Sequence, residues 1–348
     1  MLKETVRGET MTATQTHSET AWAVRPLAPA LGAEITGLAL ANLSDAELEQ
    51  LRQLMVRYGV IFCPDQHLAV EDHVALGARF GPLEGHPNLK FDTPHPEIFE
   101  LRASGGGVAD EWHSDLTFQE EPALMSILHM KRCPEVGGDT MWSSLHAAYE
   151  ALSEPMKAFL QGLTALHDAL PHNRPDKMTI HPVIRRHPET GLPALYVNEH
   201  FTRRIVELGA EESDVLLRHL TRWVQQPRFT VRYAWRAGTI AFWDNRATQH
   251  FVLNDFEGER VIQRVTVQGD RVEPYGQPAW PPYERDGRPP APEGADGGHA
   301  ADPGRPRPQR RQPDPGRRAA RHHAPRSQAQ ARPLRHQART LSERSRTV

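Results

Sequence analysis

The chain has 348 residues, which is enough for one large β domain with tails. Its 41 basic and 44 acidic residues nearly cancel, so the composition excludes a uniformly basic nucleic-acid binder. Two cysteines exclude a disulfide framework, and no apolar run reaches the roughly 20 residues that a membrane span requires. The N-terminus lacks the apolar region of a signal peptide, so we expect a cytoplasmic protein without membrane contact.

Both ends of the chain are predicted to be disordered. Residues 1–20 are polar and Thr-rich, and the second methionine, at position 11, is an alternative start to Met1. Residues 281–348 are dominated by Arg, Pro, Gly and Ala, and hold 15 arginines against 7 acidic residues, which leaves about −11 on the preceding chain. This tail lacks interleaved aromatic residues, so we expect a solvated segment and regard a nucleic-acid partner as an unfavoured alternative.

In chain order, the first predicted element is a helix that begins at Ser44, whose capping box includes Glu47, and ends at Gly59. A buried strand at 60–63 and a helix at 70–80 follow. Further strands are predicted at 98–102, 124–130, 140–143, 194–197, 229–235, 239–243 and 261–267, and further helices at 146–152, 155–163 and 212–224. Many short strands with a few helices predict a mainly β fold, a sandwich or barrel with covering helices. Rossmann and P-loop motifs are absent from the sequence.

One short motif in the chain has metal-ligand spacing. His113 and Asp115 are two residues apart, so in an extended segment both side chains point to the same side. An imidazole and a carboxylate placed in this way supply two of the three ligands in the 2-His-1-carboxylate triad of non-haem Fe(II) oxygenases. The motif is short, and surface polar residues are the alternative explanation for it.

A second segment could complete the triad. Residues 239–250 read as a hydrophobic strand through Trp243 and then a polar turn that ends at His250. Arg260 and Arg264 follow on one face of the next strand, where guanidinium groups are costly unless anions meet them. Arg260 is placed to hold a dicarboxylate. Structural salt bridges are the alternative, with partners at Asp244, Asp255 or Glu259.

The chain resembles the taurine dioxygenase (TauD/TfdA) family of Fe(II)- and 2-oxoglutarate-dependent oxygenases between residues 21 and 274. Six segments carry the resemblance in family order: 32–37, 112–118, 137–142, 181–183, 195–199 and 243–250. The resemblance implies a double-stranded β-helix (a jelly-roll, cupin-like core) with helices packed outside. We therefore predict a dioxygenase domain at residues 21–280.

Carried over position by position, the resemblance implies a role for individual residues. His113, Asp115 and His250 ligate Fe(II). Thr140 and Arg260 hold 2-oxoglutarate, which with O2 is a cosubstrate, and ascorbate is expected to support activity. The residues implied for the substrate site are His86 and Arg264 at its acid group, Phe201 as a pocket wall, and Leu89 and Leu116 beside it. Trp112 and Trp243 are further candidates for dry walls of the site.

The sequence departs from taurine dioxygenase where that enzyme surrounds the amine of its substrate. Leu89 and Ala109 replace polar residues there, and Asn173 stands in place of an aromatic wall. A pocket that loses these polar groups loses its selectivity for an ammonium group. We therefore expect a small-molecule substrate that is acidic but bulkier and more apolar than taurine.

Two biological roles suit such a substrate. The favoured one is a tailoring step in antibiotic biosynthesis, such as the oxidation of a pentalenolactone-type terpenoid acid by hydroxylation, desaturation or epoxidation. The alternative is sulfur scavenging from taurine, alkyl sulfonates or alkyl sulfates. A metal-binding jelly-roll sensor is the non-enzymatic alternative, and a homo-oligomer is compatible with every reading.

Overall fold

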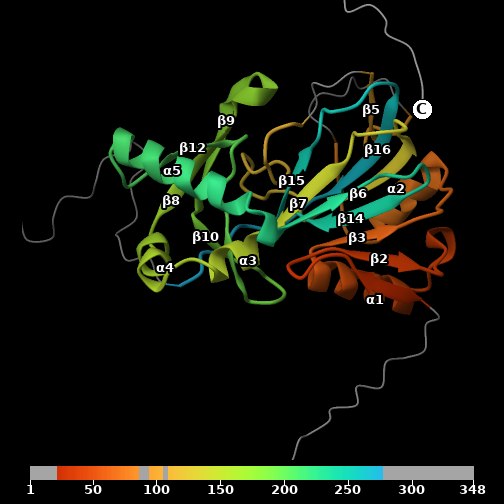
Figure 1. Cartoon of the computed structure of the whole chain (residues 1–348), viewed down its shortest axis with the longest axis horizontal. Helices are drawn as coiled ribbons and strands as arrows, with labels where there is room; N and C mark the ends of the chain where they lie inside the picture. Colours follow the sequence, from red (N-terminus) through yellow and green to blue (C-terminus); the bar gives the residue numbers. More distant parts are fainter. Residues whose placement is uncertain (1–21, 86–93, 105–108, 277–348) are drawn as a thin grey trace, which may run out of the picture. The chain divides into compact units, whose positions relative to one another are not determined.

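The computed structural model of the chain describes residues 22–85, 94–104 and 109–276, which all lie in one compact unit (Figure 1). The predicted disordered segments, 1–20 and 281–348, lie outside the described residues, so both remain predictions, as does the boundary of the domain at 21–280. No helix in the described part of the chain is long and apolar enough to cross a membrane.

The first long helix, α1 (Asp45–Tyr58), forms as the sequence predicts. The hydroxyl of Ser44 accepts a hydrogen bond from the backbone N–H of Glu47, and the Glu47 carboxylate accepts one from the Ser44 N–H at 2.9 Å. The helix ends at Gly59, whose φ of 70° is favourable for glycine. Leu51 and Met55 are buried on the face of α1 that covers the large sheet.

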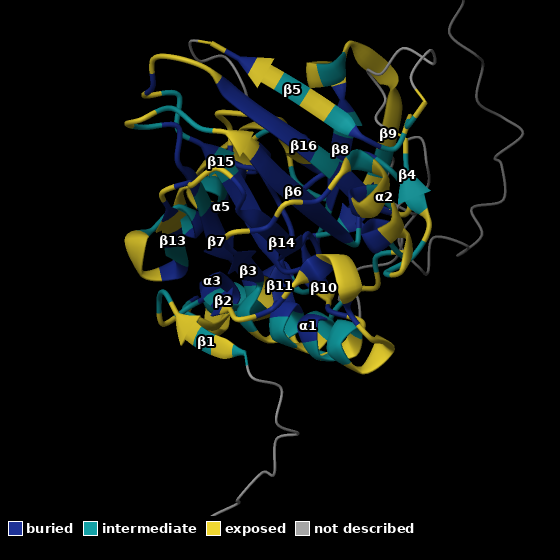
Figure 2. Ribbon diagram, turned by 90° about the vertical axis from the view of Figure 1, so that its right-hand side faces the viewer, coloured by how far each residue is buried: buried dark blue, intermediate teal, exposed yellow. Residues whose placement is uncertain are grey.

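Eight strands form this large sheet. Seven follow the order β1-β2-β3-β14-β6-β16-β4, and β5 also pairs with β16. Their bounds are β1 (Ala23–Pro26), β2 (Ala33–Thr36), β3 (Val60–Cys63), β4 (Leu83–Glu84), β5 (Phe99–Ala103), β6 (Met125–Arg132), β14 (Ile240–Asp244) and β16 (Arg260–Val267). The central strands are buried on both faces, whereas β1 is largely exposed at the edge of the sheet (Figure 2).

A small sheet, in the order β13-β7-β15, packs against the large one and closes a sandwich. Its strands are β7 (Thr140–Ser144), β13 (Thr230–Tyr233) and β15 (Thr248–Val252). Aromatic side chains from both sheets fill the space between them. Phe62 of β3 stacks on Tyr233 of β13 with ring centroids 3.7 Å apart, and it meets Trp142 of β7 edge-on at 5.2 Å. The sandwich core therefore ties the two sheets together.

The remaining elements lie on the other side of the small sheet (Figure 1). They comprise a three-stranded sheet, a two-stranded sheet and the last helices. The elements on that side are α3 (Leu145–Glu150), α4 (Glu154–Leu160), β8 (Thr164–Ala169), η2 (Leu170–His172), β9 (Arg174–Pro182), β10 (Ile184–Arg186), β11 (Pro193–Leu195), β12 (Thr202–Ile205), α5 (Ala210–Val224) and the short turn η3 (Pro227–Phe229). The helix α2 (Val70–Ala78) and the short turn η1 (Leu40–Asn42) instead belong to the large sheet, where α2 packs on β16.

The predicted helices and strands all have counterparts, with ends shifted by at most three residues. The prediction of a polar turn that ends at His250 is wrong. The turn occupies residues 245–247, and His250 lies inside β15. Thr248 and Gln249 suggested a turn because they are polar, but their side chains are buried within this strand. The sheet formed by β8, β9 and β12 was not predicted, because long β9 is exposed over most of its length and lacks an apolar alternation.

Two histidines that take no part in metal chemistry are buried between α2 and the large sheet. His73 of α2 is fully buried, and its Nε2 lies 3.1 Å from the backbone oxygen of Ile127. The ring of His129 on β6 lies 6.1 Å away. Burial is the main cause that lowers the pKa of each of these histidines to about 4.

We expect these histidines to make the fold less stable at mildly acidic pH. Between pH 6.5 and 4 the unfolded chain binds protons that the folded chain refuses, so the free energy of unfolding falls as the pH falls, by up to about 1.4 kcal/mol per pH unit for each histidine. His73→Leu should reduce the slope by that amount in urea unfolding at pH 6 and pH 5. The exposed His219→Leu is the control, and an unchanged slope in His73→Leu would contradict the expectation.

Candidate active site

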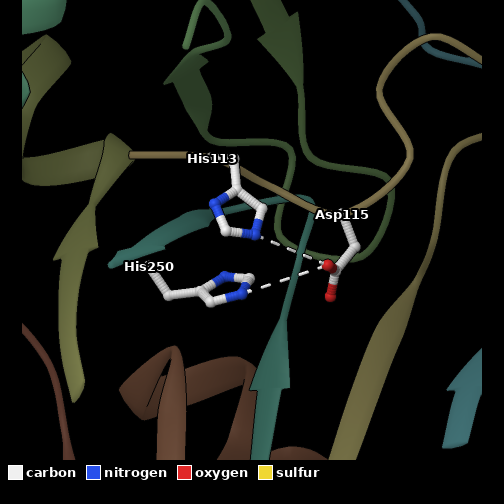
Figure 3. A group of neighbouring side chains, drawn as sticks. All are labelled: His113, Asp115 and His250. Atoms are coloured by element: carbon white, nitrogen blue, oxygen red, sulfur yellow. Dashed lines mark ion pairs between the residues drawn. The ribbon is translucent and has the colours of Figure 1, made fainter. Parts of the chain in front are cut away.

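Two histidines from distant parts of the sequence are joined by their backbones. The N–H of His113 donates to the carbonyl of His250 at 3.1 Å, and the N–H of His250 donates to the carbonyl of His113 at 2.8 Å. In such an antiparallel pair, opposing side chains project from the same face. The two imidazole rings accordingly lie 4.1 Å apart (Figure 3).

Asp115 completes a three-residue cluster. Its Oδ1 lies 3.9 Å from the Nε2 of His113 and 3.9 Å from the Nε2 of His250, as the dashed lines in Figure 3 show. The three possible ligand atoms all lie within 4.8 Å of one another, and all three residues are buried. The structure thus brings together the three residues that the sequence predicts as metal ligands.

The protonation states of this cluster fit a divalent metal. The Nδ1 of His113 donates to the backbone oxygen of Glu111 at 2.7 Å, which leaves the Nε2 lone pair directed at the cluster. Burial lowers the pKa of His113 to about 4 and that of His250 well below its ordinary value. For Asp115, burial alone would raise the pKa, but the charges of Arg264 and both histidines hold it below its ordinary range. Two neutral imidazoles and one carboxylate are the donor set that suits Fe(II).

Hydrogen bonds from the large sheet fix the carboxylate. The hydroxyl of Ser126 on β6 donates to Asp115 Oδ2 at 2.7 Å, and the backbone N–H of Asp115 donates to the side-chain oxygen of Asn245 at 3.1 Å. Asn245 also donates to Ser126 and accepts from the indole of Trp243, at 3.0 Å in both cases. The carboxylate orientation is therefore set by neighbours before any metal binds.

The turn that leads into β15 rests on a buried ion network. Asp244 is fully buried, and both of its carboxylate oxygens accept hydrogen bonds from Arg246, at 2.7 Å and 2.9 Å. The Nε2 of His187 lies 3.0 Å from one of the same oxygens, Oδ2. A buried carboxylate without such partners would be strongly destabilising. This network anchors the turn at residues 245–247, just before the strand that carries His250.

Arg260 and Thr140 meet between the two sheets. Arg260 of β16 is 2 % exposed, its Nε donates to the carbonyl of Gly138 at 3.1 Å, and its Nη2 lies 3.4 Å from the hydroxyl oxygen of Thr140 on β7. The indole of Trp235 donates to the same hydroxyl at 2.9 Å. Burial lowers the pKa of Arg260 to about 10, so the group stays cationic at neutral pH.

Arg260 and Arg264 do not form the structural salt bridges that were the alternative explanation for them, because each expected carboxylate pairs with another arginine. Asp244 pairs with Arg246, Asp255 with Arg232, and Glu259 with Arg132 and Arg102. Within the described residues, no carboxylate forms an ion pair with Arg260. Arg264 instead donates to Oδ1 of Asp115 at 3.0 Å, which places its guanidinium at the metal cluster.

Apolar side chains bound the space beside the cluster. Leu116, Phe118 and Phe201 belong to one small buried group, and the ring of Phe201 lies 6.3 Å from that of His113. On the other side, the indole of Trp243 lies 4.9 Å from His250. Trp112, a further candidate wall, packs its ring on Phe251 at 5.6 Å.

Two of the predicted substrate residues, His86 and Leu89, lie outside the described residues, so their assignments remain predictions. Ala109 is described, and its backbone oxygen accepts a hydrogen bond from Val252 at 3.0 Å. Asn173, which replaces an aromatic wall of taurine dioxygenase, is exposed at the end of η2, and the ring of the preceding residue, His172, lies 5.5 Å from that of Phe201.

Two histidines near the cluster were missed by the sequence analysis. The ring of His200 lies 5.4 Å from that of His113 and meets that of Phe201 edge-on at 4.5 Å, and its Nδ1 lies 2.6 Å from the Glu111 carboxylate. The ring of His172 lies 5.5 Å from that of Phe201. Neither histidine belongs to a spaced motif, and the only signal in the sequence was their adjacency to positions 201 and 173.

Comparison with known proteins agrees with this geometry. The model of the family "Taurine catabolism dioxygenase TauD, TfdA family" matches residues 23–266. The chain is 33 % identical to an alkylsulfatase of Acinetobacter baylyi over 71 % of this chain and 85 % of that protein. It is 34 % identical to an alpha-ketoglutarate-dependent sulfate ester dioxygenase of Pseudomonas putida, over 71 % and 89 % of the two chains.

A solved structure gives the same answer for the fold. The crystal structure of a taurine dioxygenase from Burkholderia xenovorans matches with a TM-score of 0.68 and 37 % identity, over 78 % of this chain and 94 % of that one. The predicted jelly-roll core with covering helices is thereby confirmed. The chain belongs to the TauD/TfdA family of Fe(II)- and 2-oxoglutarate-dependent dioxygenases.

Proposed function

We propose that the chain oxidises an alkyl sulfate ester or alkyl sulfonate, with Fe(II) held by His113, Asp115 and His250. The observation that carries the metal assignment is the convergence of three buried ligand atoms within 4.8 Å. When bound, Fe(II) supplies an open coordination face on which 2-oxoglutarate and O2 provide the oxidising power, with succinate and CO2 as products. The rest of the catalysis consists of binding, orienting and excluding water.

Arg260 and Thr140 are proposed to hold the distal carboxylate of 2-oxoglutarate. A buried guanidinium is costly without an anion, and no described carboxylate pairs with this one. An arginine presents two parallel N–H donors to a carboxylate, and the Thr140 hydroxyl at 3.4 Å adds a third polar contact. The cosubstrate would therefore satisfy a cation that the fold leaves unmatched.

Arg264 is proposed to bind the anionic head group of the substrate. It is held beside the cluster by Asp115, and its guanidinium also lies 5.5 Å from the ring centroid of Phe99. Leu116 and Phe201 would then contact the apolar body and keep water from the reacting carbon. Predicted partners of the head group and body at His86 and Leu89 would complete this site.

The relatives shift the choice between the two biological roles. The alkylsulfatase and the sulfate ester dioxygenase are named for sulfur-containing anions, and both align over most of their length. The role in antibiotic tailoring, which the sequence favoured on grounds of pocket size, remains a prediction that no contact in the structure favours. We therefore place sulfate esters and sulfonates first as the substrate class.

Replacing Arg260 should weaken the binding of 2-oxoglutarate selectively. Arg260→Gln removes a charge-assisted contact worth about 1.5–3 kcal/mol, which corresponds to an increase of roughly 10- to 150-fold in the KM for 2-oxoglutarate. The KM for the organic substrate should change far less. Succinate formation measures both constants, with Arg271→Gln, an exposed arginine, as the matched control. Equal increases in both KM values would exclude the assigned role.

A substrate panel should separate an apolar pocket from a taurine pocket. We expect hexyl sulfate to give a kcat/KM at least about tenfold above that of taurine, because each buried methylene contributes roughly 0.8 kcal/mol and no expected partner for the amine remains. Hexanesulfonate should fall between them or match the sulfate. The measurement is substrate-dependent succinate formation under air with Fe(II) and ascorbate. Preference for taurine would rule out the proposed substrate class.

A further inference from the structure

Trp235 lies in the connection between β13 and β14, which leads from the small sheet to the large one. Its side chain is buried in the sandwich core, where it packs edge-on against the rings of Phe62, Trp142 and Tyr233, with centroids 5.5–6.1 Å apart. Close packing on several sides fixes the indole, and the direction of its single N–H is fixed with it.

This N–H is directed at a residue of the proposed cosubstrate site. It donates to the hydroxyl oxygen of Thr140 at 2.9 Å, and the Nη2 of Arg260 lies 3.4 Å from the same oxygen. A hydroxyl group has two acceptor lone pairs and one proton to donate. The two donors therefore occupy both lone pairs, and the hydroxyl proton remains to be donated.

The Thr140 hydroxyl has no acceptor for that proton among the described residues, although Thr140 is buried. Arg260 likewise presents only N–H groups and has no carboxylate partner in the same part of the chain. The two side chains together offer donors alone. Such a pair suits the distal carboxylate of a keto-diacid, because an ionised carboxylate only accepts hydrogen bonds.

A second tryptophan of the same core has no such bond. Trp142 is fully buried, and its ring lies 6.0 Å from that of Trp235. Its N–H has no hydrogen-bond partner in the described part of the chain. The core thus contains one indole that only packs and one that packs and also donates to Thr140, so the first is a matched control for the second.

We propose that Trp235 is a positioning residue for 2-oxoglutarate: its N–H, together with Arg260, holds the Thr140 hydroxyl so that the O–H is donated to the distal carboxylate. This inference rests on the proposed function, since it takes Arg260 and Thr140 as the partners of that carboxylate. A hydrogen bond to a charged oxygen is stronger than one between neutral groups. A hydroxyl that is already oriented also loses less freedom on binding, which increases the affinity.

The test is anaerobic titration of the full-length, Fe(II)-loaded protein with two keto acids, 2-oxoglutarate and 2-oxovalerate. The second has the same keto-acid end but no distal carboxylate. Trp235→Phe removes the donor, so we expect the Kd for 2-oxoglutarate to rise about three- to tenfold and that for 2-oxovalerate to stay within about twofold. Trp142→Phe, which reduces a neighbouring ring without removing such a bond, should leave both constants within about twofold of the wild type.

Variants of Thr140 show whether the effect passes through its hydroxyl. Thr140→Val keeps the shape and removes the hydroxyl, so in this background Trp235→Phe should change the Kd for 2-oxoglutarate by less than about twofold. Thr140→Ser keeps the hydroxyl, and in that background the full increase should return. If Trp235→Phe does not fold, benzothienylalanine at position 235 takes its place, because it keeps the ring system and replaces the N–H by sulfur.

Four results would overturn the positioning role: an unchanged Kd for 2-oxoglutarate in Trp235→Phe, a parallel rise for 2-oxovalerate, an equal rise in Trp142→Phe, or the same increase in the Thr140→Val background. In each case Arg260→Gln would still weaken the binding of 2-oxoglutarate, and the proposed cosubstrate site would stand. Equal affinity of the wild type for the two keto acids would overturn that site, and this inference with it.

Discussion

The backbone pairing between residues 113 and 250 is the constraint on which the candidate active site depends. Each residue donates its N–H to the other, so the two imidazoles are held side by side without any contribution from a metal. The loop that carries His113 reaches Asp115 two residues later, where Ser126 and Asn245 fix the carboxylate. Sheet geometry thus sets the ligand arrangement, and the sandwich core keeps the sheets in place.

The same fold maintains charges that are unfavourable by themselves. Arg260 is buried against Gly138 and Thr140 without an ionic partner among the described residues, whereas the buried Asp244 is matched by Arg246. A fold selected for stability alone gains nothing from an unmatched buried cation. The contrast between these two buried groups is therefore physical support for an anionic cosubstrate at one of them, and for a purely structural function of the other.

Much of this could be predicted from the sequence because the signals were local. The capping box at Ser44 fixed the start of α1, and the spacing of His113 and Asp115 gave two ligands. His250 lies 137 residues beyond His113, so the sequence offered it only as a candidate, and the family resemblance assigned it as the third ligand. His172 and His200 escaped notice because their rings reach the site through the packing of a separate sheet, β12-β8-β9, which leaves no periodic trace in the sequence. Likewise, the ion pair of Arg264 with Asp115 depends on a tertiary contact that no spacing rule predicts.

The central claim is that three side chains hold one iron from one side. Anaerobic calorimetry of Fe(II) binding tests it most directly, in the wild type, in Asp115→Ala and in Asp110→Ala, which changes an exposed carboxylate five residues away. The account predicts one Fe(II) per chain with the same affinity in the wild type and Asp110→Ala. In Asp115→Ala the affinity should fall by more than about 100-fold, beyond what the loss of an outer hydrogen-bond partner causes. Undiminished Fe(II) binding by Asp115→Ala would contradict the account.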